Sequence, residues 1–154
     1  MLWIPTGAPG YRAAPVAAAT DRVAMLQLAL AGEPRCVIDE RELRPGASGY
    51  TYDTVRSIQA EHPGVRPVLL LGADQYAKRE SWYRWKDLIQ LCEIAVYTRP
   101  GWTVAVEKAR KIFITLLEGS ASDIRARLGR GEDVSALLPA AVLGYIREHR
   151  LYRG

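Results

Sequence analysis

The chain has 154 residues, of which 49% are apolar and 25% are charged. This length and composition suit one compact domain, residues 1–154, and exclude a disordered or fibrous chain. The net charge of +4 comes from an excess of arginine, a side chain suited to phosphate and carboxylate, but is too small to require nucleic acid.

Short β-rich runs alternate with helical patterns along the chain. The first half predicts a strand at 2–5, a helix at 21–31, a strand at 35–39, a helix at 52–61 and a strand at 67–71. The second half predicts helices from 74 and at 85–91, a strand at 93–98, a helix from 104, a strand at 112–117, and helices at 122–129 and 140–149. The strand at 67–71 is apolar throughout, as in a parallel strand covered on both faces. The alternation predicts an α/β fold, a parallel sheet with helices on both faces.

The sequence also indicates the location of the protein and the state of its cysteines. Cys36 and Cys92 lie in apolar stretches far from other ligand residues, which favours two buried thiols over a disulfide or a metal site. The first residues carry no secretory signal, and the longest aliphatic stretch is far too short to span a bilayer. We expect a cytoplasmic protein without a membrane partner.

Ligands of parallel sheets bind beyond the carboxyl ends of the strands, which directs attention to Gly72 and Asp74. The glycine lets a ligand approach the backbone, and the carboxylate of Asp74 can accept hydrogen bonds from ribose hydroxyls. The alternative interpretation is that Asp74 only caps the following helix.

Two helix starts each carry an aromatic neighbour. Trp82 stands outside any apolar periodicity and can present a flat face to an aromatic ring, although it could also pack at the domain edge beside Trp85. The backbone amides at Tyr83 and at Thr51 suit an anion, although Thr51 could equally be a helix cap. Together they predict a slot for a ring that bears a carboxylate.

A third helix start carries two hydroxyls and a guanidinium, those of Ser120, Ser122 and Arg125. Ser120 and Asp123 have the spacing of a capping pair, which is the simpler interpretation. An arginine is unfavourable at the positive end of the helix dipole, so its presence favours a phosphate site.

In this order the motifs resemble those of the bacterial nicotinate mononucleotide adenylyltransferases. Each motif is weak alone, but the ordered set covers nearly the whole chain. The matching motifs are Ile4-Pro5, Arg22-x-x-Met25, Asp39-x-Arg-Glu-Leu43, Tyr50-Thr51-x-x-Thr54, Leu71-Gly-x-Asp74, Trp82-Tyr83, Arg99-Pro-Gly101, Ser120-Ala-Ser122-x-Ile-Arg125 and Leu137-Leu-Pro139.

The resemblance implies a Rossmann-like nucleotidyltransferase of NAD biosynthesis, which joins nicotinate mononucleotide to the adenylyl group of ATP and releases pyrophosphate with Mg²⁺. Trp82 would stack on the pyridine ring, and the amides near Thr51 and Tyr83 would hold its carboxylate. The remaining residues implied at the substrate or nucleotide are Gly72, Asp74, Arg99, Ser120, Ser122 and Arg125.

The sequence departs from the family at its start. The family opens with a Gly-Gly-Thr-Phe-Asp-Pro loop and a His-x-Gly-His motif, whereas this sequence begins at what resembles the second strand. Its two histidines, His62 and His149, belong to no such motif, so no catalytic residue is identified. We expect the chain to bind the mononucleotide better than it catalyses the reaction. We also expect a gap beside the strand at 67–71, since the family's first strand is central; the sheet would close up, or a partner chain or an element-swapped dimer would fill the gap.

Other functions are considered beside this one. A non-catalytic mononucleotide-binding or interaction module would keep the slot at Trp82 without the ATP chemistry. An RNA-binding domain is suggested only by the basic pI, since basic residues and stacking aromatics do not interleave. A sister adenylyltransferase acting on phosphopantetheine fits less well, because Trp82, Tyr83 and Thr51 suit a pyridine carboxylate.

Overall fold

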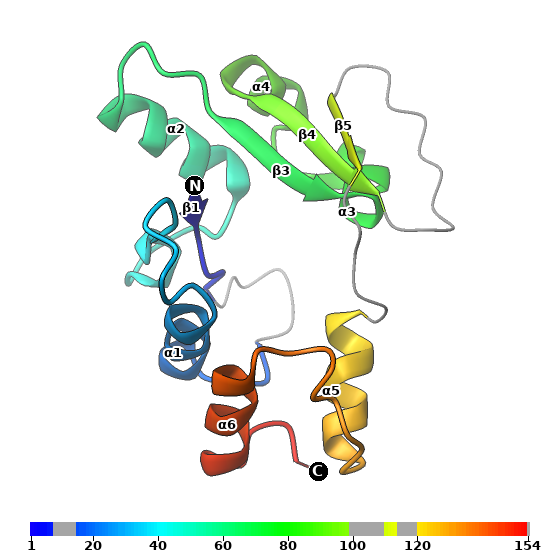
Figure 1. Ribbon diagram of the computed structural model, residues 1–154. Helices are drawn as coiled ribbons and strands as arrows, with labels where there is room; N and C mark the ends of the chain where they lie inside the picture. The colour runs from blue at the N-terminus through cyan, green and yellow to red at the C-terminus, as the bar shows by residue number, and fades with distance from the viewer. Residues whose placement is uncertain (8–14, 99–109, 114–119, 154) are drawn as a thin grey trace. The chain divides into compact units, whose positions relative to one another are not determined.

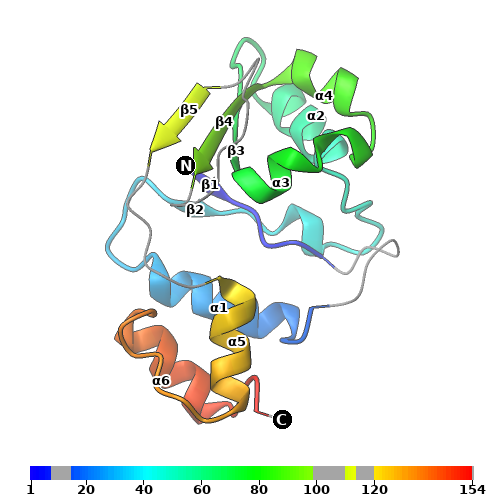
Figure 2. The same cartoon turned by 90° about the vertical axis from the view of Figure 1, so that its right-hand side faces the viewer.

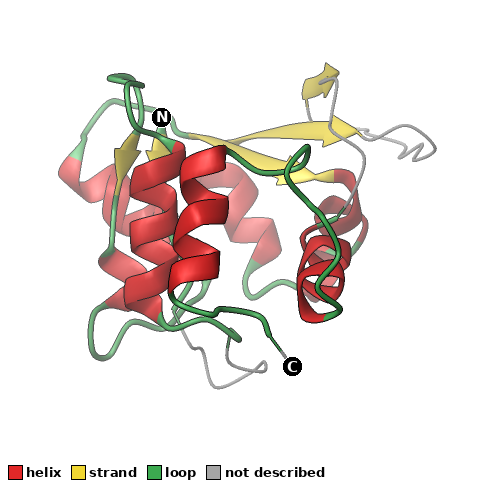
Figure 3. Ribbon diagram, turned by 60° about the horizontal axis from the view of Figure 1, so that its bottom comes forward, coloured by secondary structure: helices red, strands yellow, loops and turns green. Residues whose placement is uncertain are grey.

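A computed structural model describes residues 1–7, 15–98, 110–113 and 120–153. By their contacts the residues form two compact units, Met1–Ala47 with Leu117–Gly154 (unit 1) and Ser48–Leu116 (unit 2). Both combine helices with parallel strands, as the sequence predicts for an α/β fold (Figures 1 and 3). The single domain expected for residues 1–154 stays a prediction. No helix among these residues is both long and apolar enough to cross a bilayer.

The described residues of unit 1 form a two-stranded sheet and three α-helices. Its elements are β1 (Leu2–Trp3), α1 (Ala19–Ala29), β2 (Val37–Ile38), the 3-10 helix η1 (Arg41–Leu43), α5 (Ala121–Gly129) and α6 (Ala140–Glu148). β1 pairs with β2 in parallel. Helix α1 packs against α6, and the Tyr145 hydroxyl donates a hydrogen bond of 2.9 Å to Asp21 Oδ1 across that contact.

The described residues of unit 2 form a three-stranded parallel sheet and its helices. Its elements are α2 (Thr51–Glu61), β3 (Val68–Gly72), α3 (Ala73–Ala77), the 3-10 helix η2 (Arg79–Ser81), α4 (Trp85–Leu91), β4 (Glu93–Thr98) and β5 (Arg110–Phe113). The strand order is β3-β4-β5. The 104–109 helix and residues 114–117 of the predicted last strand lie outside the described residues, and β5 begins two residues before that prediction.

One face of the sheet in unit 2 forms the core. Leu69 pairs with Ile94 and Leu71 with Val96, so these four side chains share a face, and α2, α3 and α4 lie on that side (Figure 2). Leu88 and Val96 are fully buried there, and so is the free thiol of Cys92. Burial disfavours the thiolate and raises the pKa of Cys92 to about 11, so this thiol is inert near neutral pH. Cys36, also free, is only half-buried, whereas the sequence suggested that both would be buried.

The outer face and edge of β3 are less covered than its apolar sequence predicts. Val68 is 54% exposed and Leu70 is 40% exposed, because alternate residues of β3 point away from the core. Among the described residues β3 pairs only with β4, and β1 only with β2, so the strands form two separate sheets. The expected gap beside the strand at 67–71, and its filling by a second chain, stay predictions.

Asp39, directly after β2, stabilises unit 1 through a paired carboxylate. Its Oδ2 lies 2.7 Å from Arg41 Nε and 2.7 Å from Arg41 Nη2, and its Oδ1 accepts a 3.0 Å bond from the Arg41 amide. The two side chains are only about 15% exposed. These hydrogen bonds from Arg41 lower the pKa of Asp39 below its usual 3.8.

Asp39 therefore predicts an acid-labile contribution to stability. A carboxyl whose pKa is lower in the folded state stabilises the fold above its unfolded pKa, and this contribution disappears as the pH falls through the folded pKa. We expect the melting temperature of the wild type to fall more steeply below about pH 4 than that of Asp39→Asn. Calorimetric melting curves of both proteins test this, and parallel pH profiles would contradict it.

Candidate functional site

The N-terminus of α2 offers unbonded backbone amides. Its N-cap is Tyr50, in an extended conformation and without a side-chain cap bond, so Thr51 is the first helical residue and not the cap. Ser48 stabilises the turn: its hydroxyl accepts a 3.2 Å bond from the Tyr50 amide and donates a 2.6 Å bond to Asp53. Within the described part of the chain, the Thr51 amide has no acceptor. It is therefore available to an anion, as the sequence predicts.

The loop between η2 and α4 carries the predicted aromatic face. Trp82 is half-buried and lies edge-on to Trp85, with ring centroids 6.1 Å apart, and both rings pack at the border of the core. Trp85 is in turn edge-on to Tyr76, with centroids at 6.1 Å. Trp82 thus packs beside Trp85 and keeps an exposed portion, while its role as a stacking face for a ligand stays a prediction.

Aromatic stacking brings this loop to the start of α2. The ring of Tyr83 stacks on that of Tyr50, with centroids 4.4 Å apart and an interplanar angle of 30°. It also meets Tyr52 edge-on at 6.2 Å. Tyr83 therefore contacts both chain neighbours of Thr51, and the two anion-binding turns predicted from the sequence are adjacent in unit 2.

Arg84 is a residue of this site that sequence analysis missed. It has a left-handed backbone conformation, with φ 53° and ψ 39°. Its guanidinium lies 4.2 Å from the centroid of the Tyr52 ring and its Nε donates a 2.7 Å bond to Asp87. The order Tyr50-Thr51-Tyr52 is visible in the sequence, but no local signal indicates that Tyr83 and Arg84 contact it.

Gly72 and Asp74 lie at the carboxyl end of β3, while their binding roles stay predictions. Gly72 is the N-cap of α3 and Asp74 is the second helical residue, so the interpretation of Asp74 as a cap is wrong. The Asp74 side chain is exposed, and its Oδ2 accepts a 3.3 Å bond from Gln75 Nε2. Its carboxylate is thus accessible to hydroxyl donors at the carboxyl end of β3.

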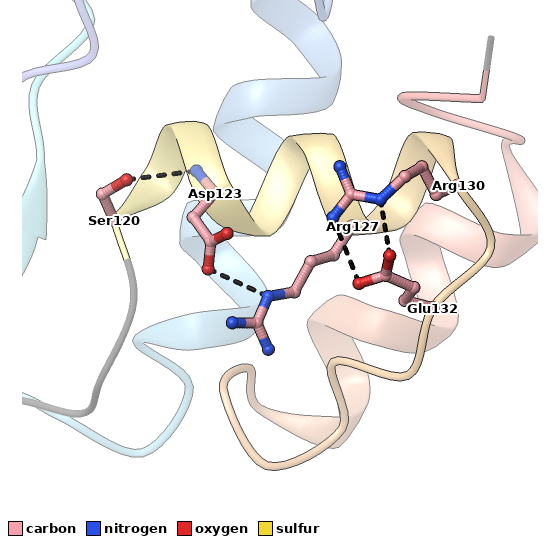
Figure 4. A network of polar contacts seen from close by, with 5 residues as sticks. All are labelled: Ser120, Asp123, Arg127, Arg130 and Glu132. Atoms are coloured by element: carbon pink, nitrogen blue, oxygen red, sulfur yellow. Dashed lines mark hydrogen bonds and ion pairs between the residues drawn. The ribbon is translucent and has the colours of Figure 1, made fainter.

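In unit 1 the start of α5 is a helix cap, the simpler of the two arrangements that the sequence predicts there (Figure 4). Ser120 is the N-cap and its hydroxyl oxygen accepts a 3.1 Å bond from the Asp123 amide. Asp123 pairs with Arg127 at 2.9 Å, and Arg125 Nη2 donates a 3.3 Å bond to the Ser122 hydroxyl. The cap exists, while the phosphate site at Ser120, Ser122 and Arg125 stays a prediction.

Arg99 beside the substrate and Mg²⁺ with ATP both stay predictions. Arg99 lies outside the described residues. No group of three or more His, Cys, Asp or Glu side chains that could hold a metal gathers within the described ranges.

A cavity of about 560 Å³ lies in unit 1, and none of the predicted site residues lines it. The lining residues are Leu128, Gly129, Arg130, Gly131, Glu132, Asp133, Leu143, Ile146, Arg147, Leu151 and Arg153.

Comparison with known proteins gives consistent matches. The cytidylyltransferase-like family model matches residues 2–127. A probable nicotinate-nucleotide adenylyltransferase of Laribacter hongkongensis is 42% identical over 97% of this chain and 79% of that protein. Another, from Hahella chejuensis, is 37% identical over 97% of this chain and 80% of that protein.

Solved structures share the fold. The nicotinic acid mononucleotide adenylyltransferase of Plasmodium falciparum, complexed with NaAD, superimposes with a TM-score of 0.77 at 17% identity and covers 98% of this chain and 81% of that one. The same enzyme complexed with APC gives a TM-score of 0.72 at 18% identity, over 87% of this chain and 75% of that one. At these identities the likeness concerns the fold alone.

Proposed function

This chain belongs to the nicotinate-nucleotide adenylyltransferases of the cytidylyltransferase-like family, and on that premise we propose that it acts in adenylyl transfer from ATP to nicotinate mononucleotide. The products are nicotinate adenine dinucleotide and pyrophosphate. The observation that carries the proposal is the contact between Tyr83 and Tyr50, which sets the Trp82 loop beside the free amide of Thr51.

Residues of unit 2 form the part of the site that binds the mononucleotide. The pyridine ring stacks on the exposed part of Trp82, and its carboxylate accepts hydrogen bonds from the amides of Thr51 and Tyr83. The positive end of the α2 dipole favours that negative charge. Asp74 accepts hydrogen bonds from ribose hydroxyls at the carboxyl end of β3.

The reaction needs little covalent help from the protein. A phosphate oxygen of the mononucleotide attacks the α-phosphorus of ATP, a new P–O bond forms, and the bond to the leaving pyrophosphate breaks. Alignment of the two phosphates and stabilisation of their charge supply the rate. For that charge we assign Ser120, Ser122 and Arg125, with Arg99 beside the substrate.

Mg²⁺ would enter with the phosphates of ATP rather than in a protein cage. This ion commonly keeps several waters and takes one or two carboxylates together with phosphate oxygens. The single exposed carboxylate of Asp74 fits that limited role. When bound, the ion neutralises charge on the leaving pyrophosphate.

Calorimetric titration with nicotinate mononucleotide, and with nicotinamide mononucleotide as the paired ligand, tests the proposal. We expect the acid to bind more tightly than the amide. Trp82→Ala should weaken both ligands by about tenfold to a hundredfold, the usual worth of an aromatic stack. Trp3→Ala, which truncates a tryptophan of β1 that is 39% exposed, is the matched control and should bind as the wild type does.

Three results distinguish the alternatives. If neither mononucleotide binds, or if Trp82→Ala binds as well as the wild type, the proposed site is wrong. Binding of the acid with formation of the dinucleotide from ATP supports the enzyme, whereas binding without product supports the mononucleotide-binding module.

A further inference from the structure

The two amides assigned to the carboxylate belong to segments that are far apart in the chain. Thr51 begins α2, whereas Tyr83 lies in the loop after η2. A carboxylate can bridge two donors only if their spacing fits within hydrogen-bond distance. Something in unit 2 must therefore fix the position of one turn relative to the other.

The aromatic contacts of Tyr83 supply such a link. Its ring is stacked on Tyr50, the residue before Thr51, and edge-on to Tyr52, the residue after it. Tyr83 is nevertheless 49% exposed, so its position depends on these two rings rather than on burial in the core.

Arg84 adds a second contact between the loop after η2 and the start of α2. Its left-handed conformation is unfavourable for a residue with a side chain, so other contacts must compensate. The guanidinium lies over the Tyr52 ring at 4.2 Å and is held at the start of α4 by Asp87 at 2.7 Å. Arg84 thus connects the start of α4 to the first turn of α2.

We propose that Tyr50, Tyr83 and Arg84 are positioning residues that fix the spacing of the Thr51 and Tyr83 amides and so set the preference for a pyridine carboxylate over a carboxamide. The inference rests on the proposed function. A carboxylate presents two acceptors to the two amides, whereas a carboxamide presents one acceptor and an NH₂ group that opposes the second amide. Correct spacing therefore benefits the acid and leaves the amide almost unaffected.

Stacking by Trp82 is separate from this arrangement. Trp82 is positioned by Trp85, and Trp85 by Tyr76, through edge-on contacts within the border of the core. A pyridine ring bearing either substituent can stack on it. Trp82 should therefore govern affinity for both ligands, while the positioning residues govern the ratio between them.

The test is the ratio of dissociation constants for nicotinamide and nicotinate mononucleotide, measured by calorimetry. Tyr50→Leu removes the stacking ring and should lower the ratio about fivefold to tenfold, the loss expected for one misplaced charge-assisted hydrogen bond. Tyr50→Phe keeps the ring and should retain the ratio. Arg84→Gly adopts a positive φ freely, so it removes the guanidinium without backbone strain, and it should lower the ratio in the same direction.

Arg79→Ala is the matched control, because Arg79 also lies over a tyrosine ring at 4.6 Å, but that of Tyr76 in α3 and not that of Tyr52 in α2. It should keep the wild-type ratio, and Trp82→Ala should weaken both ligands equally. Circular dichroism checks that each variant is folded.

An unchanged ratio in both Tyr50→Leu and Arg84→Gly, or an equal loss of affinity for both ligands, would overturn the positioning role while the proposed function stands. No binding of either ligand to the wild type would overturn both.

Discussion

Leu88→Ala is expected to lower the free energy of unfolding by about 2–5 kcal/mol, the usual result of truncating a buried leucine without refilling its space. Leu88 is 0% exposed and lies in α4 within the core cluster of unit 2, where Cys92 and Val96 are also fully buried. The cavity cannot easily collapse, because Val96 is fixed in β4 between β3 and β5.

Urea denaturation followed by circular dichroism measures this loss. Leu70→Ala is the matched control: it truncates a leucine of β3 that is 40% exposed, and it should cost about 1 kcal/mol or less. Because α4 begins directly after Arg84, a loosened α4 should also weaken mononucleotide binding. Equal losses in the two variants would mean that the core of unit 2 does not depend on Leu88.

Periodicity was a good guide to the longer elements and a poorer one to the short strands. The predicted helix at 85–91 coincides with α4, and α6 begins at Ala140 as predicted. The strands expected at 2–5 and 35–39 shrink to the two-residue β1 and β2. Pro5 has no amide to donate to the next bond of the ladder, so the pairing cannot extend past β1 in that direction.

Candidate residues for the site could be chosen from the local sequence, but the contacts between them could not be predicted. Thr51, Trp82 and Tyr83 stand out because their residue types suit an aromatic carboxylate. The stacking of Tyr83 on Tyr50 is a contact between distant parts of the sequence, which no periodicity encodes. The left-handed conformation of Arg84 could not be predicted either, because glycine or asparagine usually occupies such positions.

Gly72→Ala is expected to weaken nucleotide binding by about tenfold or more, the worth of a hydrogen bond to a charged group. The backbone at Gly72 has φ −69° and ψ 151°, which alanine adopts readily, so the difficulty is space and not conformation. An added Cβ would lie 2.6 Å from Asp74 Oδ1 and 3.2 Å from the Tyr97 hydroxyl. The Asp74 carboxylate is exposed, so it is the group that must shift, away from the position proposed for the ribose.

Gly144→Ala is the matched control for this substitution. Gly144 lies inside α6 with no atom within 4 Å of an added Cβ, so alanine should stabilise the protein by about 0.5–1 kcal/mol and leave binding unchanged. Titration with nicotinate mononucleotide and with ATP compares the two variants.

The double variant Gly72→Ala/Asp74→Asn then separates steric displacement of Asp74 from a general disturbance of the strand end. If the alanine acts by moving Asp74, each single substitution removes the same contact, and the double variant should bind no more weakly than the weaker single one. Additive losses would mean that Gly72 contributes through the approach of the ligand to its own backbone. Wild-type binding by Asp74→Asn would remove Asp74 from the site altogether.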